Sequence, residues 1–154
     1  MAQNNGKKKY RYIANEFWDD KYIRSLEPIE KYVFLYLLTN PHFHISGVYS
    51  LTMKRAAIET DLGEELIQNC LAKFAHDDKI FYLNNAFVVI PKSLAYKPLN
   101  TSIMTSVIKV LNELPQVIKK SSEYTYYLEK VSRILDASEI NGKDVVQIKK
   151  QLTI

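Results

Sequence analysis

The stretch KIFYLNNAFVVIP, from Lys79 to Pro91, constrains the fold of this 154-residue chain more than any other segment. Two runs rich in β-branched, aromatic and other large apolar residues, Ile80–Leu83 and Ala86–Ile90, flank Asn84-Asn85. Asparagine tolerates positive φ better than most residues, so the pair predicts a tight turn and the whole stretch predicts a β-hairpin. Because an isolated two-stranded hairpin is marginal in water, the rest of the chain must supply a surface for it to pack against.

A helix and a short strand are expected upstream of the hairpin. Pro28 fits the first turn of a helix, and Asn40-Pro41 ends that helix. Its apolar residues follow the helical spacing of a buried face, and they are Ile29, Tyr32, Val33, Tyr36 and Leu37. Gly47 then allows a bend, and Val48–Ser50 is expected to be a short strand that pairs with the hairpin in a three-stranded sheet.

Two further helices are expected between this strand and the hairpin. Thr52 is a good N-cap for a helix from Met53 to Thr60, and another helix runs from Gly63 to His76. The buried face of that third helix is expected to be Ile67, Cys70, Leu71 and Phe74. This order of elements predicts a winged helix-turn-helix with extra C-terminal helices, a mainly α structure with a small antiparallel sheet (α+β).

The chain divides into three expected parts: a basic N-terminal arm (1–24), the winged helix-turn-helix core (25–97) and a C-terminal helical extension (98–154). The arm is interpreted as extended with a short turn, and its residues expected to dock on the core are Phe17, Trp18, Tyr22 and Ile23. The extension is expected to form helices over 101–114 and 121–135 and a short helix over 141–152.

The helix over 121–135 carries an aromatic-rich stripe. Aromatic side chains are enriched at protein interfaces, so the stripe predicts a homo-oligomer. The candidate interface residues are Tyr124, Tyr127, Leu128, Val131 and Leu135.

Four segments carry a resemblance to a known family. They are FWDDKYIRSLEPIEKYVFLYLLTNPH, ISGVYSLTMKRAAIETDL, FAHDDKIFYLNNAFVVI and PLNTSIMTSVIKVLNELP. In order and spacing they resemble the winged-helix domain of phage replication initiators, or replisome organisers, which are related to the N-terminal domain of DnaD-like primosome proteins. The resemblance covers residues 10–118. DnaD-like proteins carry a second domain with a Tyr-x-x-x-Ile-x-x-Trp signature, and this chain lacks it because its only tryptophan is Trp18.

No motif of a nucleotide-using enzyme is present. The four glycines form neither G-x-x-x-x-G-K-[ST] nor G-x-G-x-x-G, so no catalytic residue and no cofactor are expected. His42 and His44 have no third histidine or cysteine pair nearby, so no metal site is expected. The single cysteine, Cys70, excludes an internal disulfide and fits a reducing cytoplasm. No membrane span or secretory signal is expected.

The formal net charge is +4, and it is unevenly distributed. Lysine and arginine outnumber acidic residues by six to three in 1–24 and by ten to six in 91–154, whereas 25–90 carries five against eight. The flanks are therefore basic and the winged core is acidic. The candidate DNA contacts are Lys7, Lys8, Lys9, Arg11, Lys54, Arg55, Gln68, Asn69, Lys73, Lys92 and Lys97.

The second helix of a helix-turn-helix motif normally enters the major groove. Here Gln68 and Asn69 on its outer face are suited to adenine edges; the alternative is a solvated helix face. Glu64 and Glu65 lie at the end that approaches the duplex, where phosphates repel them. In the arm, basic residues alternate with tyrosines, which suits single strands or phosphate backbones; the alternative is a solubilising tail.

Three hypotheses follow from these observations. The first, favoured by the resemblance, is a non-enzymatic DNA-binding accessory protein of phage or bacterial replication initiation, with weak or non-specific contacts to single- or double-stranded DNA. The second is a protein-interaction module that oligomerises or docks a helicase loader or another replication protein. The third is a winged-helix transcriptional regulator, which fits the fold but not the acidic start of the recognition helix.

Overall fold

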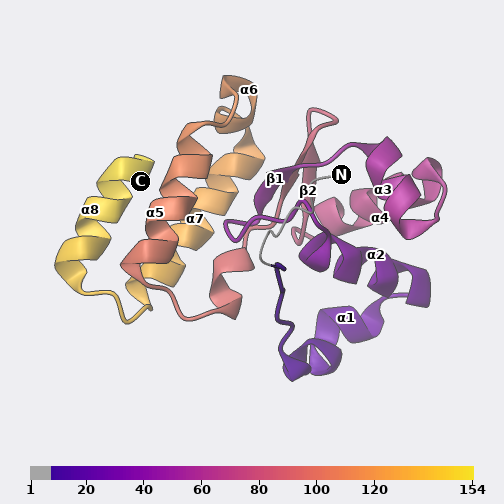
Figure 1. Cartoon of the computed structure of the whole chain (residues 1–154), viewed down its shortest axis with the longest axis horizontal. Helices are drawn as coiled ribbons and strands as arrows, with labels where there is room; N and C mark the ends of the chain where they lie inside the picture. Colours follow the sequence, from indigo (N-terminus) through magenta and orange to yellow (C-terminus); the bar gives the residue numbers. More distant parts are fainter. Residues whose placement is uncertain (1–7) are drawn as a thin grey trace, which may run out of the picture.

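A computed structural model describes residues 8–154, and a small antiparallel sheet lies between two groups of helices in it (Figure 1). The strands are β1 (Val48–Ser50), β2 (Phe81–Leu83) and β3 (Phe87–Val89). Their order is β1-β3-β2, so the hairpin strand β3 is central and pairs with β1 on its other edge. The predicted fold, mainly helical with a small three-stranded sheet in a winged-helix arrangement, is confirmed.

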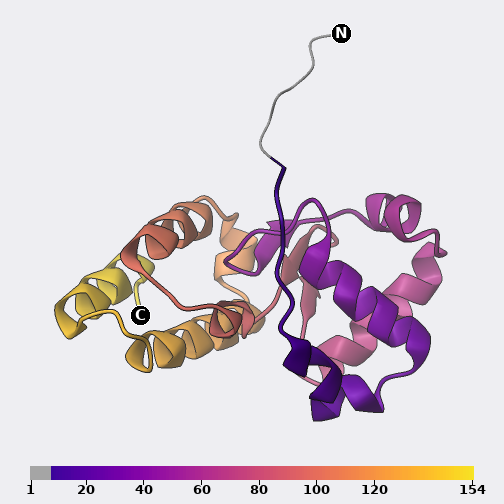
Figure 2. The same ribbon diagram turned by 60° about the horizontal axis from the view of Figure 1, so that its bottom comes forward.

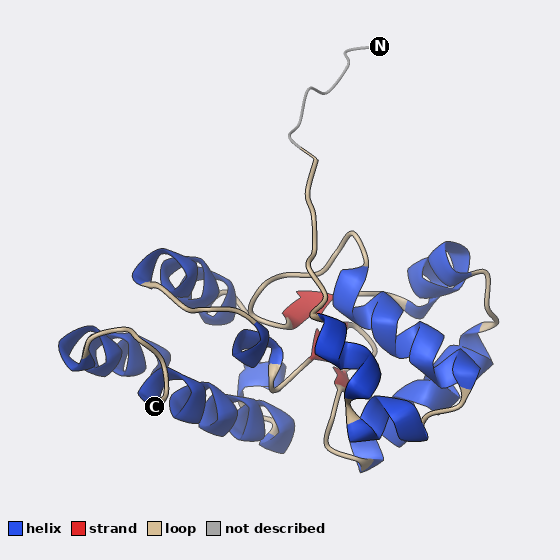
Figure 3. Ribbon diagram, turned by 90° about the horizontal axis from the view of Figure 1, so that it is seen from below, coloured by secondary structure: helices blue, strands red, loops and turns tan. Residues whose placement is uncertain are grey.

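Side chains alternate between the two faces of this sheet, so the same strands contribute to two separate cores. Tyr49 and Val88 belong to the core built with the helices that precede the hairpin. Val48, Phe81 and Val89 belong to the core built with the helices that follow it. Figure 3 shows the strands (red) between these two blocks of helix (blue). The hairpin is therefore covered on both faces by its own chain.

The elements on the N-terminal side are η1 (Asn15–Asp19), α1 (Lys21–Ser25), α2 (Pro28–Thr39), α3 (Met53–Thr60) and α4 (Glu64–His76). Thr52 caps α3 as predicted, because its side chain accepts a 3.2 Å hydrogen bond from the backbone N–H of Arg55. All four residues expected on the inner face of α4 are buried. The helix-turn-helix is formed by α3 and α4, which pack directly on each other.

Three expectations about this part were wrong. The arm is not extended throughout: residues 15–25 form two short helical segments, because Asp20 caps α1 through the N–H groups of its first turn. Trp18 does not dock on the core, since its side chain is 58% exposed. In α2 the buried stripe is rotated toward Phe34 and Leu38, and the expected core residue Tyr32 is exposed.

The tight turns next to the sheet have the backbone that their residues predict. Asn84 and Asn85 have φ angles of 54° and 50°, in the left-handed region that asparagine tolerates. Gly47 has φ of 77°, and a Cβ atom there would lie 2.4 Å from the Cβ of Ser93. Glycine is therefore required at the bend before β1 on both conformational and steric grounds.

The elements on the C-terminal side are η2 (Ser93–Tyr96), α5 (Thr101–Asn112), α6 (Gln116–Lys119), α7 (Ser122–Asp136) and α8 (Gly142–Leu152). Helices α5, α7 and α8 begin at the side-chain caps Asn100, Ser121 and Asn141. They share a core with the second face of the sheet, so packing is continuous across residue 98. Within residues 8–154, no helix combines the length and apolar content needed to cross a membrane.

The stripe expected to form an oligomer interface lies inside the molecule. Tyr124, Tyr127, Val131 and Leu135 are buried, and Leu128 is half-buried against the same core. The stripe was recognised as apolar, but it packs on its own chain, because the second face of the sheet and helices α5 and α8 cover it. These residues are therefore not available as an interface between copies of the chain.

Candidate nucleic-acid interface

A cavity of about 280 Å³ lies where the N-terminal arm meets the segment that follows the hairpin. Its lining includes residues 10–14 of the arm, the segment 92–94 with nearby Tyr96 and Lys97, and apolar residues of α2. In Figure 2 the arm (indigo) runs alongside the sheet, between the two groups of helices. We call this cavity the arm pocket. It brings together residues that are about eighty positions apart in the chain.

Arg11 anchors the arm to the loop after α2. Its Nη2 atom donates a 2.8 Å hydrogen bond to the carbonyl oxygen of Phe43, and its guanidinium lies over the Phe43 ring, 4.9 Å from the ring centroid. A planar cation is suited to this combination of stacking and hydrogen bonding. Arg11 therefore fixes the course of the arm, and part of its hydrogen-bonding capacity is already used.

Three tyrosines of the arm pocket turn much of their surface to solvent. Tyr10 is 68% exposed, Tyr12 is 84% exposed, and Tyr96 on the opposite segment is 64% exposed. Large aromatic side chains normally bury 150–250 Å² each, so three exposed rings around one cavity form an unusual surface. Arg11 lies between Tyr10 and Tyr12 in sequence and points to Phe43, which leaves both tyrosine rings outside.

The charges around the arm pocket are mixed, with a small excess of cations. Arg11, Lys79, Lys92 and Lys97 line it, together with the carboxylates Glu16, Asp20 and Asp78. Asp20 is engaged as the cap of α1, and the Lys79 ammonium lies 4.9 Å from the ring centroid of Tyr22. The exposed lysines at 92 and 97 are therefore the lining cations best placed for a polyanion.

The positive charges of the arm also affect the pKa of His44. The pKa of His44 is lowered, first by burial and then by the positive charges of Arg11 and Lys9. The imidazole of His44 is 2.8 Å from the hydroxyl of Ser46 and 3.2 Å from that of Ser106. Burial and these charges therefore disfavour the protonated form of His44, whose imidazole lies between two hydroxyl groups, and His44 does not join His42 at a shared metal position.

The outer face of α4 is exposed, as expected for a recognition helix. Gln68 and Asn69 are both open to solvent. Glu64 and Glu65 occupy the first turn, and the ammonium group of Lys73 is 3.2 Å from a carboxylate oxygen of Glu30. The one lysine of this face is therefore paired with a carboxylate, and the first turn of the helix is acidic.

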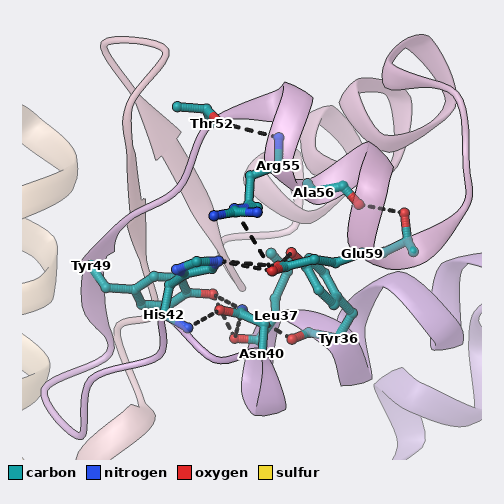
Figure 4. A network of polar contacts seen from close by, with 10 residues as sticks. Tyr36, Leu37, Asn40, His42, Tyr49, Thr52, Arg55, Ala56 and Glu59 are labelled. Carbon is teal, nitrogen blue, oxygen red and sulfur yellow. Dashed lines mark hydrogen bonds and ion pairs between the residues drawn. The ribbon is translucent and has the colours of Figure 1, made fainter. Parts of the chain in front are cut away.

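At the start of α3, Lys54 is exposed, whereas Arg55 faces a carboxylate one helical turn away. The Nε atom of Arg55 lies 4.0 Å from Glu59, which also accepts a 2.6 Å hydrogen bond from the Tyr36 hydroxyl. His42 Nε2 is 3.1 Å from the same carboxylate (Figure 4). Burial alone raises the pKa of Glu59, but these three partners outweigh it and hold the pKa below its usual value.

The network in Figure 4 joins α2, the loop after it and α3. Its second half is the buried Asn40 amide, which donates a 2.8 Å hydrogen bond to the Tyr49 hydroxyl; that hydroxyl in turn donates to the Leu37 carbonyl at 2.7 Å. The polar side chains of this network bond to one another or to backbone groups, and together they tie α2 and the loop after it to β1 and α3. Across residues 8–154, no group of three or more His, Cys, Asp or Glu side chains is arranged to hold a metal ion.

Of the predicted DNA contacts, the structure collects Arg11, Lys92 and Lys97 at one cavity, with Lys8 and Lys9 just before it in the arm. The candidates on α3 and α4 lie elsewhere, and Lys7 lies outside the described residues. Sequence reasoning missed Tyr96 and Phe43. For Tyr96 a signal was available, because the pair Tyr96-Lys97 repeats the aromatic-basic alternation of Tyr10-Arg11-Tyr12.

Comparisons of the chain with known protein families, with curated proteins and with solved structures give no match. The structure by itself defines the class: this is a winged-helix-like α+β protein in which C-terminal helices cover the second face of the sheet.

Proposed function

We propose that this chain is a non-enzymatic DNA-binding accessory protein that contacts the phosphate backbone through the arm pocket. The observation that carries the proposal is the meeting of Arg11, Lys92 and Lys97 with exposed tyrosines at a single cavity. The acidic first turn of α4 argues against a winged-helix regulator that reads bases with its recognition helix. The setting in phage or bacterial replication initiation rests on the resemblance of residues 10–118 to replisome organisers.

The test is the salt dependence of binding for a Lys92→Gln/Lys97→Gln double variant. Each phosphate neutralised on duplex DNA contributes about 0.9 to the slope of log K against log salt, and about 0.7 on a single strand. The double variant should therefore lose about 1.8 from the duplex slope or about 1.4 from the single-strand slope. A Lys143→Gln/Lys150→Gln variant, with the same charge change at exposed positions of α8, is the control and should keep the wild-type slope.

Two results would contradict this proposal. One is that the wild-type protein binds neither duplex nor single-stranded DNA at low salt. The other is that the control variant loses as much slope as the Lys92→Gln/Lys97→Gln variant, because the binding would then depend on total charge and not on the arm pocket.

A second candidate function is a docking module for another replication protein, such as a helicase loader. It is favoured by apolar side chains exposed on three helices that precede the hairpin, which are Tyr32, Ile58 and Leu66. These residues come from α2, α3 and α4 and do not line the arm pocket. An Ile58→Asp variant that keeps DNA binding but loses a partner in a reconstituted replication complex would support this function. An unchanged complex would exclude Ile58 from that surface.

A further inference from the structure

We propose that the arm pocket binds single-stranded nucleic acid, with unpaired bases stacking on Tyr10, Tyr12 and Tyr96 and with Lys92 and Lys97 contacting phosphates. This inference rests on the proposed function and narrows its ligand from DNA in general to a strand with accessible base faces. It is carried by the exposed tyrosine rings, by the anchoring of the arm and by the composition of the pocket lining.

The exposed rings are the first reason. Tyr10, Tyr12 and Tyr96 are 64% to 84% exposed and line one cavity from two distant segments. Base–aromatic stacking needs an open ring face on the protein and an unpaired base on the ligand. A duplex hides its base faces inside the stack, so exposed rings placed in this way contribute little to the affinity for a duplex. Each successive base of a single strand can stack on such a ring and add to the affinity.

The anchoring of the arm is the second reason. The 2.8 Å hydrogen bond and the stacking of Arg11 on Phe43 tie the middle of the Tyr10–Tyr12 segment to the folded core. Neighbouring side chains of an extended chain point to opposite sides, so anchoring Arg11 turns both tyrosines outward. The backbone that carries the two rings is therefore anchored next to Arg11 before the ligand arrives, which lowers the entropy lost on binding.

The composition of the pocket is the third reason. Its lining combines apolar residues such as Ile13, Phe34 and Leu94 with the cations at its rim, and its volume of about 280 Å³ is close to the lower limit of small-molecule sites. An apolar floor suits a base or a sugar, and cations suit the phosphates that connect them. Glu16 and Asp78 also line the cavity and lower its overall positive charge. A site of this kind favours a ligand that has aromatic rings as well as negative charge.

The experiment is a fluorescence-anisotropy titration of the full chain with labelled dT15, rU15 and a 15-base-pair duplex at low salt. Tyr10→Ala, Tyr12→Ala and Tyr96→Ala should each weaken single-strand binding by between about 5- and 150-fold, the usual range for losing one stacked base. The corresponding phenylalanine variants keep the ring and should bind within about twofold of wild type. Trp18→Ala, which removes an exposed ring that does not line the pocket, is the control and should have no effect.

The outcomes separate this inference from the proposed function. Loss of dT15 or rU15 binding in the alanine variants, with duplex binding unchanged or weak throughout, supports the inference; comparing dT15 with rU15 then identifies DNA or RNA as the preferred strand. If the alanine variants bind single strands as tightly as wild type while Lys92→Gln/Lys97→Gln still lowers the salt slope, only the stacking inference is overturned. If the wild-type chain binds none of the three ligands, both the inference and the proposed function fail.

Discussion

Replacing Tyr127 with phenylalanine tests whether the C-terminal helices are an integral part of the fold. Tyr127 is fully buried in α7, and its hydroxyl donates a 2.6 Å hydrogen bond to the carbonyl oxygen of Ser46, 81 residues away. Burial raises the pKa of this phenol well above its usual value, which favours the protonated form that donates the hydrogen bond. The bond joins the bend before β1 to the helices on the far face of the sheet.

The Tyr127→Phe variant keeps the ring and removes only the hydroxyl, so it leaves a buried carbonyl without this donor. An unsatisfied buried polar group costs about 1–3 kcal/mol, so the free energy of unfolding should fall by that amount. For a chain of this size about 1 kcal/mol corresponds to about 2–4 °C, which gives a fall in Tm of about 2–12 °C. Urea denaturation followed by circular dichroism measures the first quantity, and calorimetry measures the second.

Tyr126→Phe is the matched control for this experiment. Tyr126 is the neighbouring residue, and it contacts its surroundings with its ring, which is 6.0 Å from the Phe81 ring and 5.0 Å from the Lys130 ammonium. Its stability should change by less than about 0.5 kcal/mol, as is usual when no buried network is disturbed. Equal effects of the two variants, or no effect of Tyr127→Phe, would refute the view that this hydrogen bond ties the extension to the winged core.

Three further predictions concern the bend, the polar network and the recognition helix. Gly47→Ala should destabilise the fold by at least about 1–2 kcal/mol, because φ is 77° there and the new Cβ meets atoms at 2.4 and 2.8 Å; Gly142→Ala, with open space around it, should be neutral or stabilising in the same urea titration. The pKa of Glu59 is depressed in the folded state, so the contribution of its carboxylate to the free energy of unfolding is present above the usual pKa of 4.5 and is lost as the pH falls further. The difference in stability between wild type and Glu59→Gln should therefore close on acidification. A difference that is independent of pH contradicts this account. Gln68→Ala and Asn69→Ala should change DNA affinity little, and a loss of about 1–3 kcal/mol at one base position would show that α4 is a base reader after all.

Much of the fold could be predicted from local chemistry. The cap Thr52, the helix start at Pro28 and the left-handed turn at Asn84-Asn85 each depend on a few consecutive residues, and each lies where the sequence predicted it. The apolar stripe of α7 was also recognised. The surface on which that stripe packs was not predicted, because period-2 alternation in a short strand does not reveal whether the second face of the sheet is covered or exposed.

The candidate site was predictable only in part, because it depends on tertiary contacts. The basic and aromatic character of the arm is plain in the sequence, and so are the lysines that follow the hairpin. That Arg11 lies against Phe43, and that Tyr96 faces the same cavity as Tyr12, follows only from how the arm crosses the core. The short helices of the arm were missed for a related reason, since they are stabilised by one cap and by contacts such as Phe17 with Phe34, not by helical periodicity.

Photo-cross-linking tests the central claim most directly, because it reports which residues touch the ligand. A single-stranded oligonucleotide containing 5-iodouracil would be bound to the full chain at low salt and irradiated, and the modified residues would be identified by mass spectrometry of the digested protein. The account predicts cross-links at Tyr10, Tyr12 or Tyr96. Cross-links confined to the outer face of α4, around Gln68 and Asn69, would contradict it.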